Sequence, residues 1–164
     1  MAPVRLRVAL DANVLIAGTM LPRWPHEVMR AALLGTFDTA LPEQVVQEAR
    51  GHLPGRRGLE DLDAFLIDCA VELLPMPSPD LVMTNLDLVR SEKDVPIALA
   101  LLAANVDILV TNDRDFTDEG ATAERFREKV RVMLPAVFLR DVVGWTSSEL
   151  ESIRNRGWSD LQNP

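Results

Sequence analysis

Short β-type runs of apolar residues alternate along this chain with longer segments whose apolar residues recur at helical spacing. Strands that alternate with helices of roughly 10 to 15 residues pair in parallel through crossover connections, and the helices cover both faces of the sheet. We therefore predict an α/β fold with three α/β/α layers around a central, mainly parallel sheet. The strands are expected at residues 4–10, 37–41, 71–74, 107–111 and 130–134.

Several of the helices have recognisable beginnings and ends. Gly35 can stop one helix, and Pro42 suits the first position of the next. Residues 146–149, Thr-Ser-Ser-Glu, have the pattern of a capping box before the last helix. Residues 52–58 are rich in Gly, Pro and Arg and are predicted to form a loop. The other helices are expected at residues 26–34, 42–53, 59–70, 81–90, 94–105, 122–129 and 136–143.

Composition limits the kinds of protein that this chain can be. Its 164 residues carry a formal net charge of −8, which suits one globular domain and not a protein that coats nucleic acid with a broad positive surface. Cys69 is the only cysteine, which excludes a disulfide framework and a thiolate-held metal site. The longest apolar run, residues 97–104, is too short to cross a membrane. We expect a cytoplasmic protein without membrane contact, because the first residues also lack a signal-peptide pattern.

Acidic residues lie at or just beyond the ends of two predicted strands. Asp11 ends the first strand, and Asp113 follows the strand at 107–111, with Asn13 and Asp115 close behind them. Each Asp alone fits a helix cap or a turn. A parallel sheet brings both strand ends to one edge, where neighbouring carboxylates need a proton or a cation between them. Because oxygen ligands favour hard cations, the pair indicates a Mg²⁺ or Mn²⁺ site.

Two further acids lie on predicted helices that could face the same edge. Glu48 lies on the helix that begins near Pro42, and Asp94 lies where the helix from Val95 onward begins. The simpler interpretations are an exposed helical acid for Glu48 and a helix cap for Asp94. Rival motifs are absent, because the chain has neither a glycine-rich nucleotide-binding signature nor a serine nucleophile elbow. Its two histidines, His26 and His52, are too few and too far apart for a histidine-based site.

These four acids lie in segments that resemble the PIN-domain family: residues 8–15, 42–48, 94–98 and 109–116. Residues 130–139 are similar to that family's closing strand and following helix. The resemblance implies a ribonuclease that binds Mg²⁺ or Mn²⁺ in an acidic pocket and hydrolyses RNA. It also implies one nuclease domain over residues 1–143, with residues 144–164 as its C-terminal helix and tail.

The resemblance implies roles for individual residues. The matching catalytic acids are Asp11, Glu48, Asp94 and Asp113, and the expected metal ligands are Asp11, Asp94, Asp113 and Asp115. Asn13 and Thr111 match positions that support these acids through hydrogen bonds. The chain departs from the family pattern at Ala12, where Thr or Ser is common, and at Pro42, where Ser often opens the helix. Both departures affect the hydrogen bonds that hold the acids.

An RNA strand that approaches so acidic a pocket also needs positive side chains at its edge. The candidates are Arg50, Arg56 and Arg57, near the predicted loop after the Glu48 helix, and Arg114, inside the Asp113 turn. A compositional bias toward Arg on a solvated loop explains the first three equally well. A salt bridge to a neighbouring acid explains the last.

Three functions remain open from the sequence. The first is an endoribonuclease that acts as the toxin of a toxin–antitoxin pair, silenced by a small antitoxin protein; a homodimer is also implied by the family. The second is a PIN-like binding module that has lost catalysis and serves in a complex. The third is a Mg²⁺-dependent phosphatase of the haloacid dehalogenase type, although that chemistry requires a second Asp where this chain has Asn13.

Overall fold

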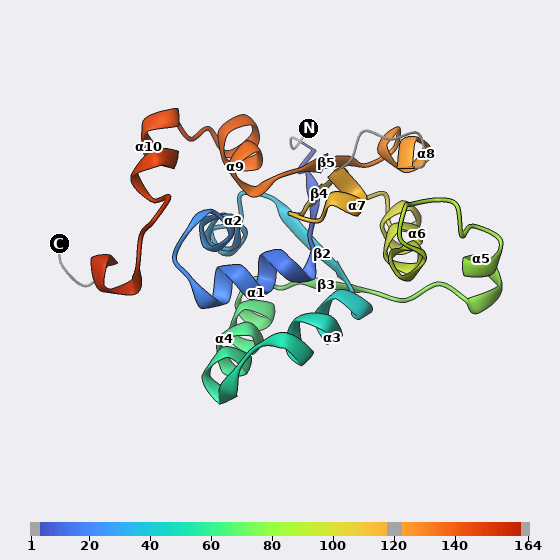
Figure 1. Ribbon diagram of the computed structural model, residues 1–164, viewed down its shortest axis with the longest axis horizontal. Coiled ribbons are helices and arrows are strands. Elements are labelled where there is room, and N and C mark those ends of the chain that lie inside the picture. Colours follow the sequence, from blue (N-terminus) through green and yellow to red (C-terminus); the bar gives the residue numbers. More distant parts are fainter. Residues whose placement is uncertain (1–3, 118–122, 162–164) are drawn as a thin grey trace.

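Five parallel strands form one sheet in the computed structural model, which describes residues 4–117 and 123–161. Their spatial order is β3-β2-β1-β4-β5 (Figure 1). All four pairings are parallel, as the crossover pattern of the sequence predicts. The first strand begins later than expected, at Arg7 instead of Val4. The strands are β1 (Arg7–Leu10), β2 (Asp38–Pro42), β3 (Glu72–Leu74), β4 (Ile108–Val110) and β5 (Arg131–Met133).

Helices cover both faces of this sheet, which confirms the three-layer α/β/α prediction (Figure 1). Helices α1, α2 and α4 lie on one side, and α5, α6 and α8 lie on the other. Among the described residues, no helix has the length and apolar character that a membrane crossing needs. The α-helices are α1 (Ala12–Met20), α2 (Trp24–Leu33), α3 (Glu43–His52), α4 (Gly55–Asp68), α5 (Pro79–Met83), α6 (Val95–Ala103), α7 (Arg114–Thr117), α8 (Glu124–Arg127), α9 (Pro135–Phe138) and α10 (Ser147–Ser152). The shorter turns are η1 (Glu92–Asp94), the π-helical η3 (Leu139–Val143) and η4 (Trp158–Leu161).

The predicted loop at residues 52–58 is wrong. Helix α4 begins at Gly55, so only Leu53 and Pro54 separate it from α3. Pro54 is extended, and Gly55 has a φ of +74°, a backbone conformation that glycine adopts without a steric penalty. Arg56 and Arg57 therefore lie in the first turn of a helix.

The helix predicted at residues 81–90 is also wrong over most of its length, because α5 ends at Met83. Two polar side chains satisfy the Leu81 carbonyl group: Thr84 donates its hydroxyl at 3.1 Å and Asn85 its amide at 2.8 Å. Such local hydrogen bonds compete with helix continuation. Two predicted helix boundaries are confirmed. Gly35 ends α2 with a φ of +73°, and the capping box at residues 146–149 opens α10.

The position of β1 decides where a ligand site can form. Its residues Val8, Ala9 and Leu10 are fully buried between β2 and β4. The chain leaves β1 toward β2 and later returns to the other side of β1 as β4, so the strand order reverses between β1 and β4. In open parallel sheets the ligand crevice lies outside the carboxyl ends of the strands at this reversal point.

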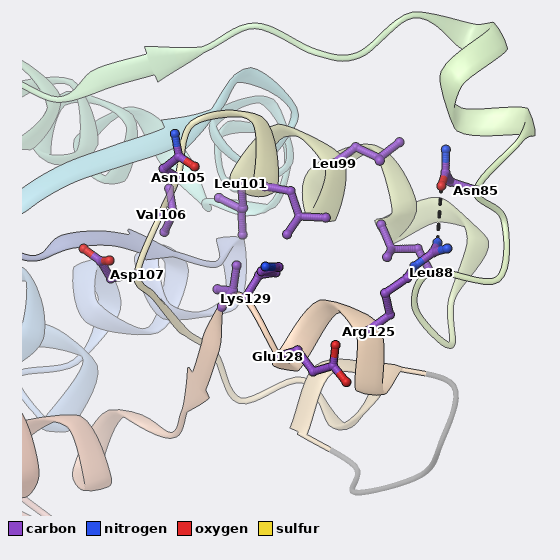
Figure 2. Close-up of a pocket in the computed structure, with 12 residues that line it drawn as sticks. Asn85, Leu88, Leu99, Leu101, Asn105, Val106, Asp107, Arg125, Glu128 and Lys129 are labelled. Carbon is purple, nitrogen blue, oxygen red and sulfur yellow. Dashed lines mark hydrogen bonds between the residues drawn. The ribbon is translucent and has the colours of Figure 1, made fainter.

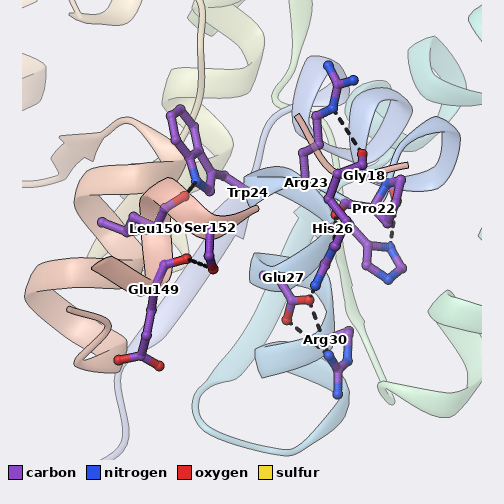
Figure 3. A network of polar contacts seen from close by, with 11 residues as sticks. Gly18, Pro22, Arg23, Trp24, His26, Glu27, Arg30, Glu149, Leu150 and Ser152 are labelled. Carbon is purple, nitrogen blue, oxygen red and sulfur yellow. Dashed lines mark hydrogen bonds and ion pairs between the residues drawn. The ribbon is translucent and has the colours of Figure 1, made fainter. Parts of the chain in front are cut away.

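The C-terminal segment crosses back over α1 and α2. The Trp24 indole donates to the Leu150 carbonyl group at 2.8 Å, and the Trp158 indole donates to the Met20 carbonyl group at 2.9 Å. Between Leu150 and Trp158 in the sequence, the Arg156 guanidinium pairs with the buried Glu27 carboxylate at 2.6 Å. Figure 3 shows Trp24 bonded to Leu150, and Glu27 with its second partner Arg30.

Candidate metal centre

The four acids that the sequence singles out line one hollow of about 160 Å³. It lies at the carboxyl ends of β1 and β4, where the strand order reverses. Asp11 directly follows β1, and its backbone N–H donates to the Val110 carbonyl group of β4 at 3.0 Å. The hollow is lined by Asp11, Ala12, Asn13, Ile16, Glu48, His52, Lys93, Asp94 and Asp113.

Three carboxylates come closest together: those of Asp94, Asp113 and Asp115. One oxygen from each lies within 4.8 Å of the other two, which is a separation that a single metal ion can bridge. We call these three residues the acidic trio. Asp94 ends η1 at the start of α6, whereas Asp113 and Asp115 lie where β4 passes into α7. Two separate elements, on either side of α6 and β4 in the sequence, therefore supply one potential ligand set.

Asp94 is the member of the acidic trio that most needs a cation. The residue is only 4% exposed. Among the described residues, its Oδ2 atom is buried and has no hydrogen-bond partner. A buried carboxylate in this state is unfavourable unless it takes up a proton or contacts a positive charge. The donor set consists only of carboxylate oxygens, so the acidic trio fits a hard divalent cation.

Burial raises the pKa of Asp94 from its ordinary 3.8 to about 7, and the negative charges of Asp11, Asp113 and Glu48 add to the effect. The positive charge of Lys93 works in the opposite direction. A bound divalent cation would also lower the pKa of Asp94, because an opposite charge favours the ionised carboxylate. Cation binding is thus coupled to loss of a proton at Asp94.

Asp11 lies beside the acidic trio and is not a member of it. Its Oδ1 accepts from the Ala12 N–H at 2.8 Å, so the same carboxylate caps α1. Its Oδ2 accepts from the Thr111 hydroxyl at 2.7 Å and from the Asn13 amide at 3.2 Å. Burial raises the pKa of Asp11, although the bond from Thr111 opposes this shift. The structure therefore gives Asp11 a clear role in holding the end of β1 against the end of β4.

Thr111 and Asn13 tie this arrangement together. The Thr111 side chain is fully buried, and its hydroxyl oxygen accepts from the Asp113 N–H at 2.9 Å and from the Asn13 amide at 3.3 Å. The Asn13 side-chain oxygen Oδ1 accepts from the Asn112 backbone N–H at 3.2 Å. One hydroxyl group thus links Asp11 to the backbone that carries Asp113.

Glu48 reaches the hollow from α3. Its Oε1 accepts from the Gln44 side-chain amide at 3.0 Å, and the same amide donates to the Lys93 carbonyl group at 3.0 Å. Gln44 therefore joins α3 to η1. Pro42 precedes α3 as its N-terminal flanking residue, instead of occupying the first helical position, and contributes no side-chain hydrogen bond.

Sequence reasoning missed three residues at this site: Gln44, His52 and Lys93. Gln44 and His52 are each four residues from Glu48, so Gln44, Glu48 and His52 share one face of α3. This spacing could have identified Gln44 and His52. The His52 Nδ1 lies 2.8 Å from the Glu48 carbonyl oxygen. Lys93 directly precedes Asp94, but nothing in the local pattern distinguishes it from an ordinary surface lysine.

The predicted substrate-contacting arginines lie outside the hollow. Arg50 pairs with Asp63, and Arg56 pairs with Glu60 at 3.0 Å one turn further along α4. Arg57 lines a different hollow together with Thr19 and Trp158. Arg114 begins α7 as an exposed residue and is not among those that line the acidic hollow.

A larger hollow of about 570 Å³ lies between α6 and α8, and Figure 2 shows its lining side chains. Leucines such as Leu99 and Leu102 form much of its wall. Its Arg125 donates to the Asn85 side chain at 3.2 Å. It extends to Val106 and Asp107, at the amino end of β4, opposite the acidic edge. Among the described residues, no trio of potential metal ligands is found there.

Comparison with known proteins adds no family assignment, since no protein-family model and no curated protein matches this chain. The resemblance to PIN domains stays a prediction from the four acidic segments, their spacing and residues 130–139. The convergence of their carboxylates is a separate, geometric observation.

Proposed function

We propose that this protein is a metal-dependent endoribonuclease that uses Mg²⁺ or Mn²⁺ to hydrolyse RNA phosphodiester bonds. One observation carries the proposal: the buried Oδ2 of Asp94, which has no hydrogen-bond partner in the described part of the chain, belongs to a trio of carboxylates that can surround one cation. The motif resemblance to PIN domains adds the substrate class. The location at the reversal point of a parallel sheet fits a ligand site.

The acidic trio would hold the cation. When bound there, a divalent ion would lower the pKa of an attacking water and would neutralise charge on the phosphoryl oxygens. Thr111 and Asp11 fix the backbone that carries Asp113. Glu48 lines the same hollow with one oxygen held by Gln44, and its carboxylate would orient the attacking water. Hydrolysis on this pattern leaves 5′-phosphate and 3′-hydroxyl ends.

The phosphatase alternative is less well supported. That chemistry needs a free nucleophilic Asp after the first strand and a second Asp two residues later. Asp11 instead accepts three hydrogen bonds, from Ala12, Asn13 and Thr111. Asn13 occupies the second position, with its amide bonded to both Asp11 and Thr111.

RNA cleavage with Mn²⁺ or Mg²⁺, with and without EDTA, tests the proposal. We expect the wild type to cleave single-stranded RNA only with the metal. Asp94→Asn and Asp113→Asn should each lose at least about 100-fold of the rate, because each removes an anionic ligand. Asp61→Asn, an exposed acid on α4, is the matched control and should retain full activity.

Cleavage that persists in EDTA, or in the Asp94→Asn and Asp113→Asn variants, would overturn the nuclease assignment. A wild type that binds Mn²⁺ and RNA but leaves the RNA intact would favour the catalytically inactive binding module.

We further propose that the protein is the toxin of a toxin–antitoxin pair and binds a small antitoxin. This proposal rests on the PIN resemblance. A short reading frame directly upstream, whose product co-purifies with this protein and suppresses cleavage, would support it. A chain that cleaves RNA but has no such neighbour would contradict it. The homodimer that the family implies can be tested by the molar mass in solution.

A further inference from the structure

Lys93 lies at the acidic hollow, but the proposed function gives it no role. It lines the acidic hollow next to Asp94, on the exposed side of η1. Its charge is close enough to Asp94 to oppose the rise in the pKa of that carboxyl group. Among the described residues, the Lys93 ammonium group takes part in none of the ion pairs.

The backbone of Lys93 is fixed from two sides. Gln44 of α3 donates to its carbonyl group at 3.0 Å, and the following residue, Asp94, donates its N–H to the Ser91 carbonyl group at 3.0 Å. A flexible side chain therefore extends from an anchored backbone at the edge of the hollow. Apart from His52, whose Nδ1 is engaged with the Glu48 carbonyl group, no other basic side chain among the described residues lines this hollow.

The hollow presents four carboxylates, from Asp11, Glu48, Asp94 and Asp113, to an approaching polyanion. An RNA phosphate next to the cleaved bond therefore needs a positive side chain close by. The arginines expected to provide it are paired with other acids, line another hollow or lie outside this one. A lysine ammonium group on a long, flexible stem binds phosphate as a point charge.

We propose that Lys93 binds a backbone phosphate of the RNA substrate at the edge of the metal centre. This inference rests on the proposed function. It makes Lys93 a substrate-binding residue that offsets the negative charge of the acidic hollow, and it leaves the holding of the cation to the carboxylates.

Salt dependence of RNA binding tests this assignment directly. Each phosphate contact in a single-stranded complex contributes about −0.7 to the slope of log affinity against log salt concentration. We would measure anisotropy of a labelled single-stranded oligoribonucleotide in Ca²⁺, between about 50 and 200 mM KCl, with a gel to show that the RNA stays intact. Lys93→Met should bind more weakly, with a slope shallower by about 0.7, whereas Lys93→Arg should keep the wild-type slope.

The chain offers a close control, because Lys93 and Lys129 are its only lysines. Lys129 precedes β5 and lines the large hollow at the opposite edge of the sheet (Figure 2). Lys129→Met changes the net charge by the same amount and should leave the slope unchanged. Mn²⁺ binding by Lys93→Met should be retained, since the acidic trio is intact.

The outcomes separate the two proposals. If the wild type cleaves RNA with metal but Lys93→Met keeps the wild-type slope, the Lys93 assignment is wrong and the nuclease proposal stands. Equal loss of slope in Lys93→Met and Lys129→Met also overturns the assignment, because it indicates a general charge effect. Absence of metal-dependent cleavage by the wild type overturns the proposed function itself.

Discussion

Asp94 combines near-complete burial with a carboxylate oxygen that has no hydrogen-bond partner among the described residues. Its pKa of about 7 means that a proton stabilises the metal-free site near neutral pH. A cation can replace that proton, since the Asp113 and Asp115 oxygens lie within reach of the same point. The electrostatics of this one residue therefore connect stability, pH and metal binding.

The pH dependence of stability follows from the sign of this shift. Between an ordinary pKa of 3.8 and a folded-state pKa of about 7, the folded protein holds a proton at Asp94 that the unfolded chain releases. The contribution of Asp94 to the unfolding free energy therefore falls as pH rises through this window. An asparagine side chain at this position has no proton to lose. Metal-free Asp94→Asn should therefore gain stability relative to the wild type, by more than about 1 kcal/mol at pH 7.

Urea denaturation in EDTA at several pH values checks this expectation. Asp61→Asn, at an exposed position, should differ from the wild type by a constant amount over the same range. If the difference in unfolding free energy between Asp94→Asn and the wild type were also constant with pH, folding would not raise the pKa of Asp94.

Thr111 is the second residue whose removal should affect the site. Thr111→Val keeps the shape of the side chain but leaves the Asp113 N–H without its acceptor and the Asp11 carboxylate without its buried hydroxyl donor. We expect a loss of about 1 to 3 kcal/mol in unfolding free energy and about 10- to 100-fold in Mn²⁺ affinity. Thr111→Ser keeps the hydroxyl and should retain most of the affinity. Calorimetric Mn²⁺ titration measures these affinities. Equal Mn²⁺ affinity for Thr111→Val and Thr111→Ser would contradict the proposal that the Thr111 hydroxyl supports the metal site.

The residues that could be predicted are those with a positional signal. Asp11 directly follows the buried strand β1, Asp113 follows Thr111 and Asn112 after the end of β4, and the carboxyl ends of parallel strands converge. Lys93 could not be predicted, because its place at the site depends on how η1 approaches α3 across a long stretch of sequence. Such tertiary contacts leave no local pattern.

At the scale of elements, most strands and the central helices follow from periodicity and end signals. Helix α1 does not, because residues 12–20 lack a polar face: Val14 and Leu15 are fully buried, and the sequence shows no amphipathic stripe. Helix α4 begins earlier than the sequence predicts, because a glycine such as Gly55 after a proline is typical of a loop. In the structure, Pro54 and Gly55 instead form a short connection between α3 and α4.

Close packing of α1 on α2 gives an element-scale prediction. A Cβ atom at Gly18 would lie 2.5 Å from the Met29 sulfur and 3.0 Å from the Pro25 backbone. The sulfur can move, but the backbone cannot, so Gly18→Ala should lower the unfolding free energy by about 1 to 3 kcal/mol. Gly51→Ala, also in a helix but with nothing within 4 Å, should instead be neutral or stabilising by up to about 1 kcal/mol. Equal effects in urea denaturation would contradict the packing explanation.

At the scale of the whole molecule, the strand order is what brings Asp11 and Asp113 together. The alternation of strands and helices predicts a parallel sheet, but it does not specify that β1 lies between β2 and β4. That order comes from long-range packing, which a single sequence does not display. It places the reversal point, and with it the acidic trio, at the middle of the sheet.

The C-terminal segment contributes to stability through one buried pair. Arg156 and Glu27 side chains are 15% and 5% exposed, and Glu27 keeps a second partner in Arg30. Arg156→Met should therefore cost about 2 kcal/mol of unfolding free energy. Arg154→Met, which removes an exposed cation over the Trp24 ring, should cost less than about 1 kcal/mol. Similar losses in both variants would argue against a buried anchor at Arg156.

Anomalous diffraction from crystals soaked in Mn²⁺ tests the central claim, that the acidic trio holds a divalent cation, more directly than any other measurement. We expect a manganese peak bounded by the carboxylates of Asp94, Asp113 and Asp115, and no such peak in Asp94→Asn crystals soaked in the same way. A wild-type map without a peak at this place, or with manganese bound only elsewhere, would contradict the claim.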